Sequence, residues 1–410
     1  MNNISIFFSK IGHSIKHFFK YLFKAQNENN PSYAKKFIRN NGVQSVITSL
    51  ICILIGLLVG YITLLIINPE GAASGFQTIL LNFLTFNRGE LELKYFAKTL
   101  VNTTPLLCCA LSVLFAYKAG LFNIGASGQY LVASCITLLC SLVLHLPWYV
   151  CTILAIIGGA IMGSLVGLLK AYFNVNEVIS SIMLNWIALY VVNLIIKKSP
   201  AWNDSVNETF NIAENASTSL LPTLGLNNAT GFAYFGIGLF IAIFFAVVVI
   251  IVLRRTVFGY ELMATGFNRN GAKYAGINEK RSIILSMAIS GALAGLGAPL
   301  FYLSGMGIYT CPSVVPQMGF DGISAAFLGG LNPIGAIFSS YFLQHIMSAG
   351  AKLNTDMYCS QTADLIVGVI IYLCAFAGGL RIFLNKLSNG EIKFHFKKKK
   401  NRPQMLKEDK

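Results

Sequence analysis

The sequence FNIGASGQ, from Phe122 to Gln129, interrupts a nearly continuous apolar stretch of the chain. Asn123, Gln129 and two glycines stand where a membrane helix would otherwise continue, just after the lone cation Lys118. Backbone polar groups in lipid need internal partners, so such a break is tolerated only where protein or a water-filled cavity surrounds it. In several transporter folds, breaks of this kind mark substrate or gating elements. A short turn between two packed helices is the other interpretation, and spacing alone favours neither.

The composition around this stretch is that of a membrane protein. Hydrophobic residues make up 55% of the 410 residues and charged ones 11%, whereas a soluble domain has about 25% charged residues. The net charge is +15, and its cations gather beside apolar runs in residues 1–43, 254–282 and 386–410. By the positive-inside rule, these segments and both termini are predicted to be cytoplasmic. No aromatic-basic platform accompanies the charge, so nucleic acid is not an expected partner.

The apolar runs predict an all-α, polytopic membrane protein with broken or kinked helices. Nine spans are expected at about 46–67, 99–117, 130–146, 148–169, 178–196, 234–253, 282–303, 333–347 and 365–384. Two cytoplasmic termini require an even number of crossings. The short segment 321–330 must therefore cross as a broken helix that turns at residues 331–333, which gives about ten crossings.

Three regions are expected along the chain. Residues 1–43 are expected to form a basic, amphipathic cytoplasmic segment. Residues 1–25 place apolar side chains at helical spacing with lysines between them, which predicts a helix lying on the anionic inner leaflet, and residues 26–43 are a polar linker. Residues 44–385 form the transmembrane domain, and residues 386–410 form a basic cytoplasmic tail. A short interfacial helix is expected at about 77–86, before the second span.

Several polar residues within or beside the spans need an explanation. Glu177 and Asn185 are eight residues apart, close to two helical turns, so they lie near one face of a helix. Glu177 could complement the dipole at that helix's start, although an intramembrane acid is a functional candidate by default. We expect some of Asn123, Gln129, Glu177 and Asn185 to line a substrate pathway. The alternative is helix–helix hydrogen bonding, worth about 0.6 to 2 kcal/mol for each bond.

The sequence lacks the motifs of catalysis and nucleotide binding. It contains no G-x-x-x-x-G-K-[ST] phosphate loop, no G-x-S-x-G elbow and no H-E-x-x-H pair. No C-x-x-C pair or histidine cluster indicates a metal site. We therefore expect no enzyme activity and no cofactor bound by this chain. Energy would come from a partner ATPase or an ion gradient, for which Glu177, Asp321 and Asp364 are the few candidate acids.

Three stretches carry a resemblance to a known family. FNIGASGQ resembles the signature of permease subunits of ABC importers for nucleosides, ribose-type sugars and branched-chain amino acids, with Ser127 at a position where the family usually has an acidic residue. Residues 176–185 (NEVISSIMLN) are similar to the nucleoside-importing branch. Residues 266–278 (GFNRNGAKYAGIN) resemble the family's cytoplasmic loop that docks on the ATPase. The resemblance covers about residues 99–380.

This resemblance implies a permease that imports nucleosides by alternating access across the membrane of a bacterial cell. Its implied partners are a cytoplasmic ABC ATPase that uses ATP, a second permease subunit, identical or different, and an extracytoplasmic substrate-binding lipoprotein, besides membrane lipids. A permease for ribose-type sugars and an ion-coupled secondary transporter stay open as alternatives.

The docking-like loop has its own expectations. Residues 272–275 are long enough for one helical turn, with Tyr274 protruding and small side chains forming a face that seats in a groove of the partner. Glycine at the end of the turn is expected to adopt a positive φ. The coupling candidates are Gly266, Asn268, Arg269, Ala272, Tyr274 and Gly276.

Overall fold

The computed structural model describes residues 41–85, 89–350, 352–354, 356–359 and 361–375. The chain divides into two compact units. One comprises residues 1–48 and 376–410, of which only the first turns of a helix, from Asn41, are described. The other is residues 49–375, and the contacts below all lie within it. The predicted basic tail, and all but the last residues of the predicted amphipathic segment, lie outside the described residues.

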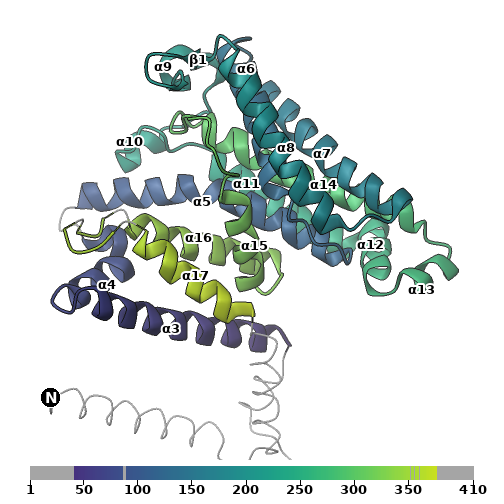
Figure 1. The fold of residues 1–410 in the computed structure, drawn as a ribbon, viewed down its shortest axis with the longest axis horizontal. Helices are drawn as coiled ribbons and strands as arrows, with labels where there is room; N and C mark the ends of the chain where they lie inside the picture. Colours follow the sequence, from purple (N-terminus) through teal and green to yellow (C-terminus); the bar gives the residue numbers. More distant parts are fainter. Residues whose placement is uncertain (1–40, 86–88, 351, 355, 360, 376–410) are drawn as a thin grey trace, which may run out of the picture. The chain divides into compact units, whose positions relative to one another are not determined.

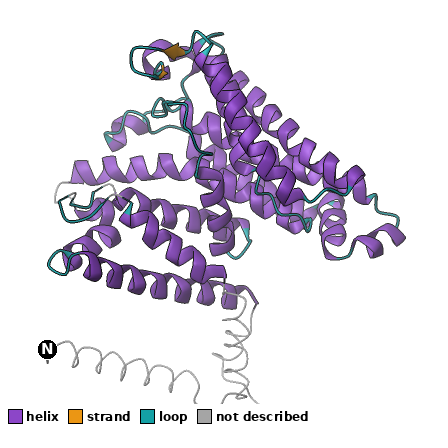
Figure 2. Cartoon of the chain, viewed as in Figure 1, coloured by secondary structure: helices purple, strands orange, loops and turns teal. Residues whose placement is uncertain are grey.

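The described chain is almost entirely helical (Figures 1 and 2), so the all-α prediction is confirmed. The long helices are α3 (Asn41–Ile67), α5 (Gly89–Lys118), α7 (Trp148–Phe173), α8 (Glu177–Lys197), α11 (Gly238–Arg255) and α14 (Glu279–Tyr302). The shorter ones are α4 (Ala72–Leu81), α6 (Ala126–Leu142), α9 (Ile212–Asn215), α10 (Leu226–Thr230), α12 (Val257–Phe267), α13 (Arg269–Tyr274), α15 (Met318–Leu328), α16 (Pro333–Gly350) and α17 (Thr362–Ala375). Two 3-10 turns, η1 (Asn82–Thr85) and η2 (Ser217–Ser219), complete the helical elements.

A single small hairpin interrupts the described helices. Its strands β1 (Trp202–Asn203) and β2 (Glu208–Thr209) are antiparallel, with Trp202 opposite Thr209. The hairpin belongs to the polar segment 197–232, which joins α8 to α11. In Figure 1 it lies near α9, away from α12 and α13.

Six described helices are long and apolar enough to cross a membrane by themselves, namely the six long ones. The four remaining predicted crossings correspond to α6, α15, α16 and α17. The first three pack against long helices, and α17 packs against α15 and α16. The polytopic membrane fold is therefore confirmed, and four of its segments are shorter or more polar than an independent span requires.

Helix α5 begins ten residues earlier than the expected second span. Glu90 and Glu92 lie in its first turn, where acidic side chains favour the positive end of the helix dipole. The expectation followed only the apolar part, so it missed this charged extension. The interfacial helix expected at 77–86 is also displaced: α4 begins at Ala72 and is followed by η1.

Helices α7 and α14 form the most closely packed pair. A methyl group added at Gly159 would collide with the Gly291 carbonyl, and one added at Gly163 would collide with the Met287 carbonyl. Small residues at four-residue spacing let two backbones approach this closely. Close helix packing therefore accounts for these glycines of α7, and we call this contact the glycine seam.

Candidate functional site

Helix α6 begins inside the helix bundle, because the chain turns back after α5. The turn uses Gly120, whose φ is +72°. The chain then runs alongside α5 until Asn123 reaches Ser112, whose hydroxyl accepts a hydrogen bond from the Asn123 amide at 3.0 Å. Ser112 lies six residues before the end of α5, which corresponds to about 9 Å of helix. Helix α6 therefore starts about two turns below the end of α5.

A fully buried polar network holds this break in place. The Asn123 amide nitrogen lies 2.8 Å from Gln129 Oε1 and 2.7 Å from the hydroxyl of Ser290 on α14. The Gln129 amide donates back to Asn123 Oδ1 at 3.2 Å. The Ser112 and Ser290 hydroxyls lie 3.0 Å apart. Three helices and the break thus share one network, and neither serine was singled out from the sequence.

Asn185 joins α8 to the same break. Its side-chain oxygen accepts from the backbone N–H of Gly128 at 3.0 Å, and its amide donates to the carbonyl of Ile124 at 3.1 Å. Both backbone groups belong to the interrupted region, where the regular helix ladder does not supply partners. Asn185 is therefore a clamp between α8 and the start of α6.

Asn193 is a second polar clamp on α8, which the sequence reasoning missed. Its amide donates to the carbonyl of Pro312 at 2.8 Å, and the Tyr309 hydroxyl donates to its side-chain oxygen at 2.7 Å. It follows Asn185 by eight residues, so the two share a helix face. That spacing of asparagines in an apolar run was the available signal.

Helices α6 and α15 both begin inside the bundle, and we call them the two half-helices. The start of α15 meets the start of α6. A methyl group at Gly319 would collide with Ser127 in the first turn of α6. At the other end of α15, the Phe327 ring contacts the rings of Tyr117 and Phe122, with centroids 5.6 Å and 6.1 Å apart. Helix α15 thus covers only the part of the bundle nearest the end of α5. The short helix expected at 321–330 is present as α15, and its crossing of the membrane as a broken helix stays a prediction.

Two buried hydroxyls beside this junction have no hydrogen-bond partner among the described residues. They are those of Ser127 on α6 and Ser181 on α8. Both side chains are fully buried. Unpaired buried polar groups are rare in folded proteins and carry a free-energy cost. These hydroxyls retain hydrogen-bonding capacity at the point where the two half-helices begin.

Glu177 lies apart from the other three pathway candidates. It begins α8 and forms an ion pair with Lys170 near the end of α7, with 2.8 Å between Glu177 Oε2 and Lys170 Nζ. Asn176 caps the same helix, because its side chain accepts from the N–H of Val178 at 2.8 Å. Asn123, Gln129 and Asn185 therefore converge at the break, whereas Glu177 bridges the hairpin between α7 and α8.

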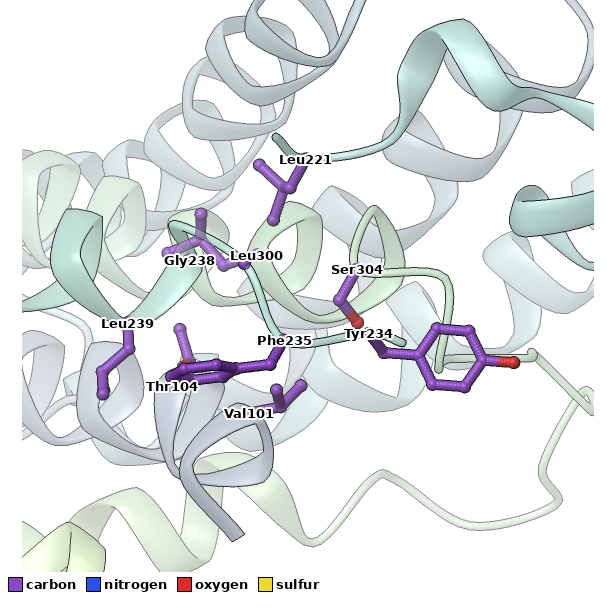
Figure 3. A pocket seen from close by; sticks show the side chains of 10 residues that line it. Val101, Thr104, Leu221, Tyr234, Phe235, Gly238, Leu239, Leu300 and Ser304 are labelled. Carbon is purple, nitrogen blue, oxygen red and sulfur yellow. The ribbon is translucent and has the colours of Figure 1, made fainter. Parts of the chain in front are cut away.

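The threonines before Pro105 on α5 are satisfied within their own helix. The hydroxyls of Thr103 and Thr104 donate to the carbonyls of Thr99 and Leu100 at 2.7 Å and 3.1 Å. Thr104 also borders a hollow between α5, α11 and α14 (Figure 3), whose volume is about 10 Å³. That volume holds about one water molecule. The segment around Pro105 is packed helix rather than the wall of a wide cavity.

Three side-chain caps divide the loop after α11 into helices. Thr256, Asn268 and Asn278 each accept a backbone N–H bond at the start of α12, α13 and α14, at 3.1, 3.0 and 3.1 Å. Gly276 follows α13 with a φ of +83°, as expected for a residue that ends this turn.

The exposed face of α12 and α13 differs from the expected one. Tyr274 protrudes as predicted, with 94% of its surface exposed, and Phe267 is 95% exposed. Ala272, however, was expected on the docking face and is buried against this chain, with only 4% exposed. Ala272 lies on the side of the short helix α13 that faces the rest of this chain, so it is not available to a partner. The exposed surface of α12 and α13 is formed by the aromatic residues instead.

Gly266 connects this loop to the break. A methyl group at Gly266 would lie 2.6 Å from the Lys118 carbonyl oxygen and 2.7 Å from the Gly120 nitrogen. Backbone therefore contacts backbone between the last turn of α12 and the turn that leads into α6. We call this contact the loop–break joint.

Comparison with known proteins finds a matching family. Residues 95–375 match a family described as the permease component of the branched-chain amino acid transport system. The chain belongs to this family of transport permeases. It is a multi-pass membrane protein whose two half-helices begin side by side within the bundle. No solved structure matches the chain.

Three relatives of this permease have names that state a transport role. The guanosine ABC transporter permease protein NupP of Bacillus subtilis is 32% identical over 83% of this chain and 96% of its own length. The nucleoside ABC transporter permease protein NupB of Lactococcus lactis is 32% identical over 85% of this chain and 95% of its own length. A second guanosine permease of Bacillus subtilis, NupQ, is 27% identical over 60% of this chain and 77% of its own length.

Proposed function

We propose that this chain is a permease subunit of an ATP-driven importer of nucleosides. The observation that carries the proposal is the 32% identity that extends over 96% of a guanosine permease. The family match over residues 95–375 includes both the half-helices and the capped loop. A relative named for nucleosides shows a similar match over 95% of its length.

The proposed translocation pathway opens where α6 and α15 begin. Helix N-termini carry a partial positive charge and free N–H groups, which suit the carbonyl, ring-nitrogen and hydroxyl acceptors of a nucleoside. The unpaired hydroxyls of Ser127 and Ser181 add donors and acceptors there. Asn123, Gln129 and Asn185 serve this pathway by holding the break, since their side chains already bond within the chain.

Glu177 is proposed to serve the same pathway at its inner end. Its carboxylate is only partly buried and pairs with Lys170 at the hairpin between α7 and α8. An ion pair at this position can hold the two helix ends together in one conformation and release them in another.

Coupling to ATP is proposed to run through α12 and α13. The exposed rings of Phe267 and Tyr274 offer apolar contact area to a cytoplasmic ATPase, a use for which aromatic side chains are enriched in interfaces. Movement of the loop would reach the break through the loop–break joint, where Gly266 contacts residues 118–120. Asn268, Arg269 and Gly276 shape or flank the docking turn.

We also propose the orientation and the remaining partners. The loop 256–281 and both termini face the cytoplasm, since cations concentrate there. A second permease completes the pathway; Bacillus subtilis has two named guanosine permeases, NupP and NupQ. A substrate-binding lipoprotein would deliver the nucleoside to the opposite face.

The energy source tests this proposal. The sequence has no phosphate loop, so hydrolysis must occur on another subunit. Cells that carry this chain with its partners should lose uptake of labelled guanosine after vanadate treatment. Uptake should survive a protonophore while ATP is maintained. The reverse pattern would instead support an ion-coupled carrier.

Substrate class needs a separate measurement. Unlabelled nucleosides should compete with labelled guanosine, whereas free ribose at the same concentration should not. Competition by ribose alone, with vanadate sensitivity intact, would reassign the permease to sugars and leave the ATP-driven mechanism standing.

A further inference from the structure

An apolar crevice lies between α11 and α14, away from the half-helix junction. Its volume is about 230 Å³, and only hydrocarbon side chains line it. On α11 these include Val248, Val249 and Val252; α14 contributes Ile289, and Phe258 at the start of α12 closes one end. An apolar cavity of about 150 Å³ is enough to stay dry and bind benzene. This crevice therefore favours a hydrocarbon occupant over water.

The crevice is short enough to lie within one leaflet of a bilayer. Its lining on α11 runs from Phe245 to Val252, which is about 10 Å of helix. Val252 lies two residues before Arg254, where α11 reaches its charged end. The hydrocarbon core is about 30 Å thick, so the crevice falls within the half nearest that end.

Unpaired cations stand at the same end. Lys118 ends α5 and Arg254 lies in the last turn of α11, and the two are close enough to repel each other. In the described part of the chain, no acidic side chain lies within ion-pair distance of either residue. Basic pockets between membrane helices are suited to anionic lipid headgroups.

We propose that this crevice binds an anionic phospholipid. One acyl chain lies against Val248 and Ile289, and the headgroup lies on Lys118 and Arg254. The apolar lining suits the acyl chain, and the two cations, which repel each other, suit a negatively charged headgroup. Since α11 continues through Thr256 into α12, the lipid packs against the root of the proposed docking loop. The site depends on the membrane fold, not on which molecule is transported.

A photoreactive lipid tests the acyl-chain site. The full-length chain with its partner subunits would be placed in nanodiscs containing phosphatidylglycerol with a diazirine in its acyl chain. Labelling should concentrate in the peptides that contain Val248 and Ile289. Val248→Phe fills the crevice and should remove most of this labelling. Val247→Phe is the matched control: it makes the same change one position away, on a side chain that is 45% exposed.

Two results would overturn the acyl-chain site. One is equal labelling in the Val248→Phe and Val247→Phe variants. The other is that the unmodified protein is not labelled at all, while Val248→Phe, but not Val247→Phe, loses subunit assembly. That result would assign the crevice to a protein partner. Size-exclusion chromatography of each variant distinguishes that second result from simple misfolding.

A headgroup comparison tests the cations. Labelling by the phosphatidylglycerol probe should exceed labelling by a phosphatidylcholine probe with the same chain. Removing one cation, in Lys118→Gln or Arg254→Gln, should reduce this preference about fivefold. Lys273→Gln, in the exposed α13, is the charge-matched control and should leave it unchanged. Equal labelling by both probes in the unmodified protein would contradict an anionic-lipid site.

Discussion

Gly266→Ala should uncouple ATP hydrolysis from transport. The added methyl carbon would stand 2.6 Å from both the Lys118 oxygen and the Ala119 carbonyl carbon, whereas carbon contacts are optimal at about 3.5–4.0 Å. Only backbone atoms face it, so α12 must withdraw from the turn by about 1 Å. Overpacking of this kind costs about 1–3 kcal/mol. That cost lowers the population of the closed loop–break joint about 5- to 150-fold.

The assay compares transport with hydrolysis in proteoliposomes containing the assembled importer. Gly266→Ala should keep its ATPase activity but transport at least about fivefold less nucleoside for each ATP hydrolysed. Gly271→Ala is the control in the same loop, because its methyl group would meet Asn268 Cγ at an ordinary 3.4 Å. Alanine there also favours the helix by about 0.5–1 kcal/mol. The same transport-to-hydrolysis ratio in both variants would refute a mechanical role for the joint.

Three further predictions concern other parts of the chain. Asn185→Leu leaves the buried Gly128 N–H and the part-buried Ile124 carbonyl without their side-chain partner, so the free energy of unfolding should fall by about 1–3 kcal/mol. Unchanged apparent nucleoside affinity would confirm that Asn185 only holds the break, and reduced affinity would indicate direct contact with the substrate. Gly276→Val places a side chain at a positive φ, which strains the docking turn. Membrane insertion should stay normal, because the loop lies outside the long helices, while co-purification of the ATPase should fall. Normal uptake by the double variant Gly276→Val, Tyr274→Ala would show that the loop is only a linker. Burial, with repulsion from Lys98, lowers the pKa of Lys352 from 10.5 to about 8. Between those pH values the folded protein binds fewer protons than the unfolded chain, so thermal stability should rise as the pH increases. Lys352→Met should flatten that rise.

Hydropathy and charge were sufficient to predict the framework of this fold. The short helix at α15 was found because two basic termini imply an even number of crossings, and its crossing stays a prediction. The positive φ of Gly276 followed from its place after a short helical turn. Both predictions depended on patterns that are local in the sequence or simple to count.

The details of the site could not be read in the same way. Helix α6 was expected to start near Tyr130 but starts at Ala126, because Asn123 is held by Ser290, 167 residues away. A serine within an apolar run gives no indication of such a distant partner. The inward orientation of Ala272 was also hidden, since a helix of six residues shows no clear amphipathic period.

The glycine seam limits where this permease can change shape. If α7 slid along α14, the Gly291 carbonyl would collide with a neighbouring residue of α7 that carries a side chain. The two helices should therefore move together as one rigid body. Spectroscopic labels on α7 and α14 would then report a constant separation throughout the transport cycle. The same labels on α12 and α6 would report the motion, which makes the seam a built-in reference frame for measuring it.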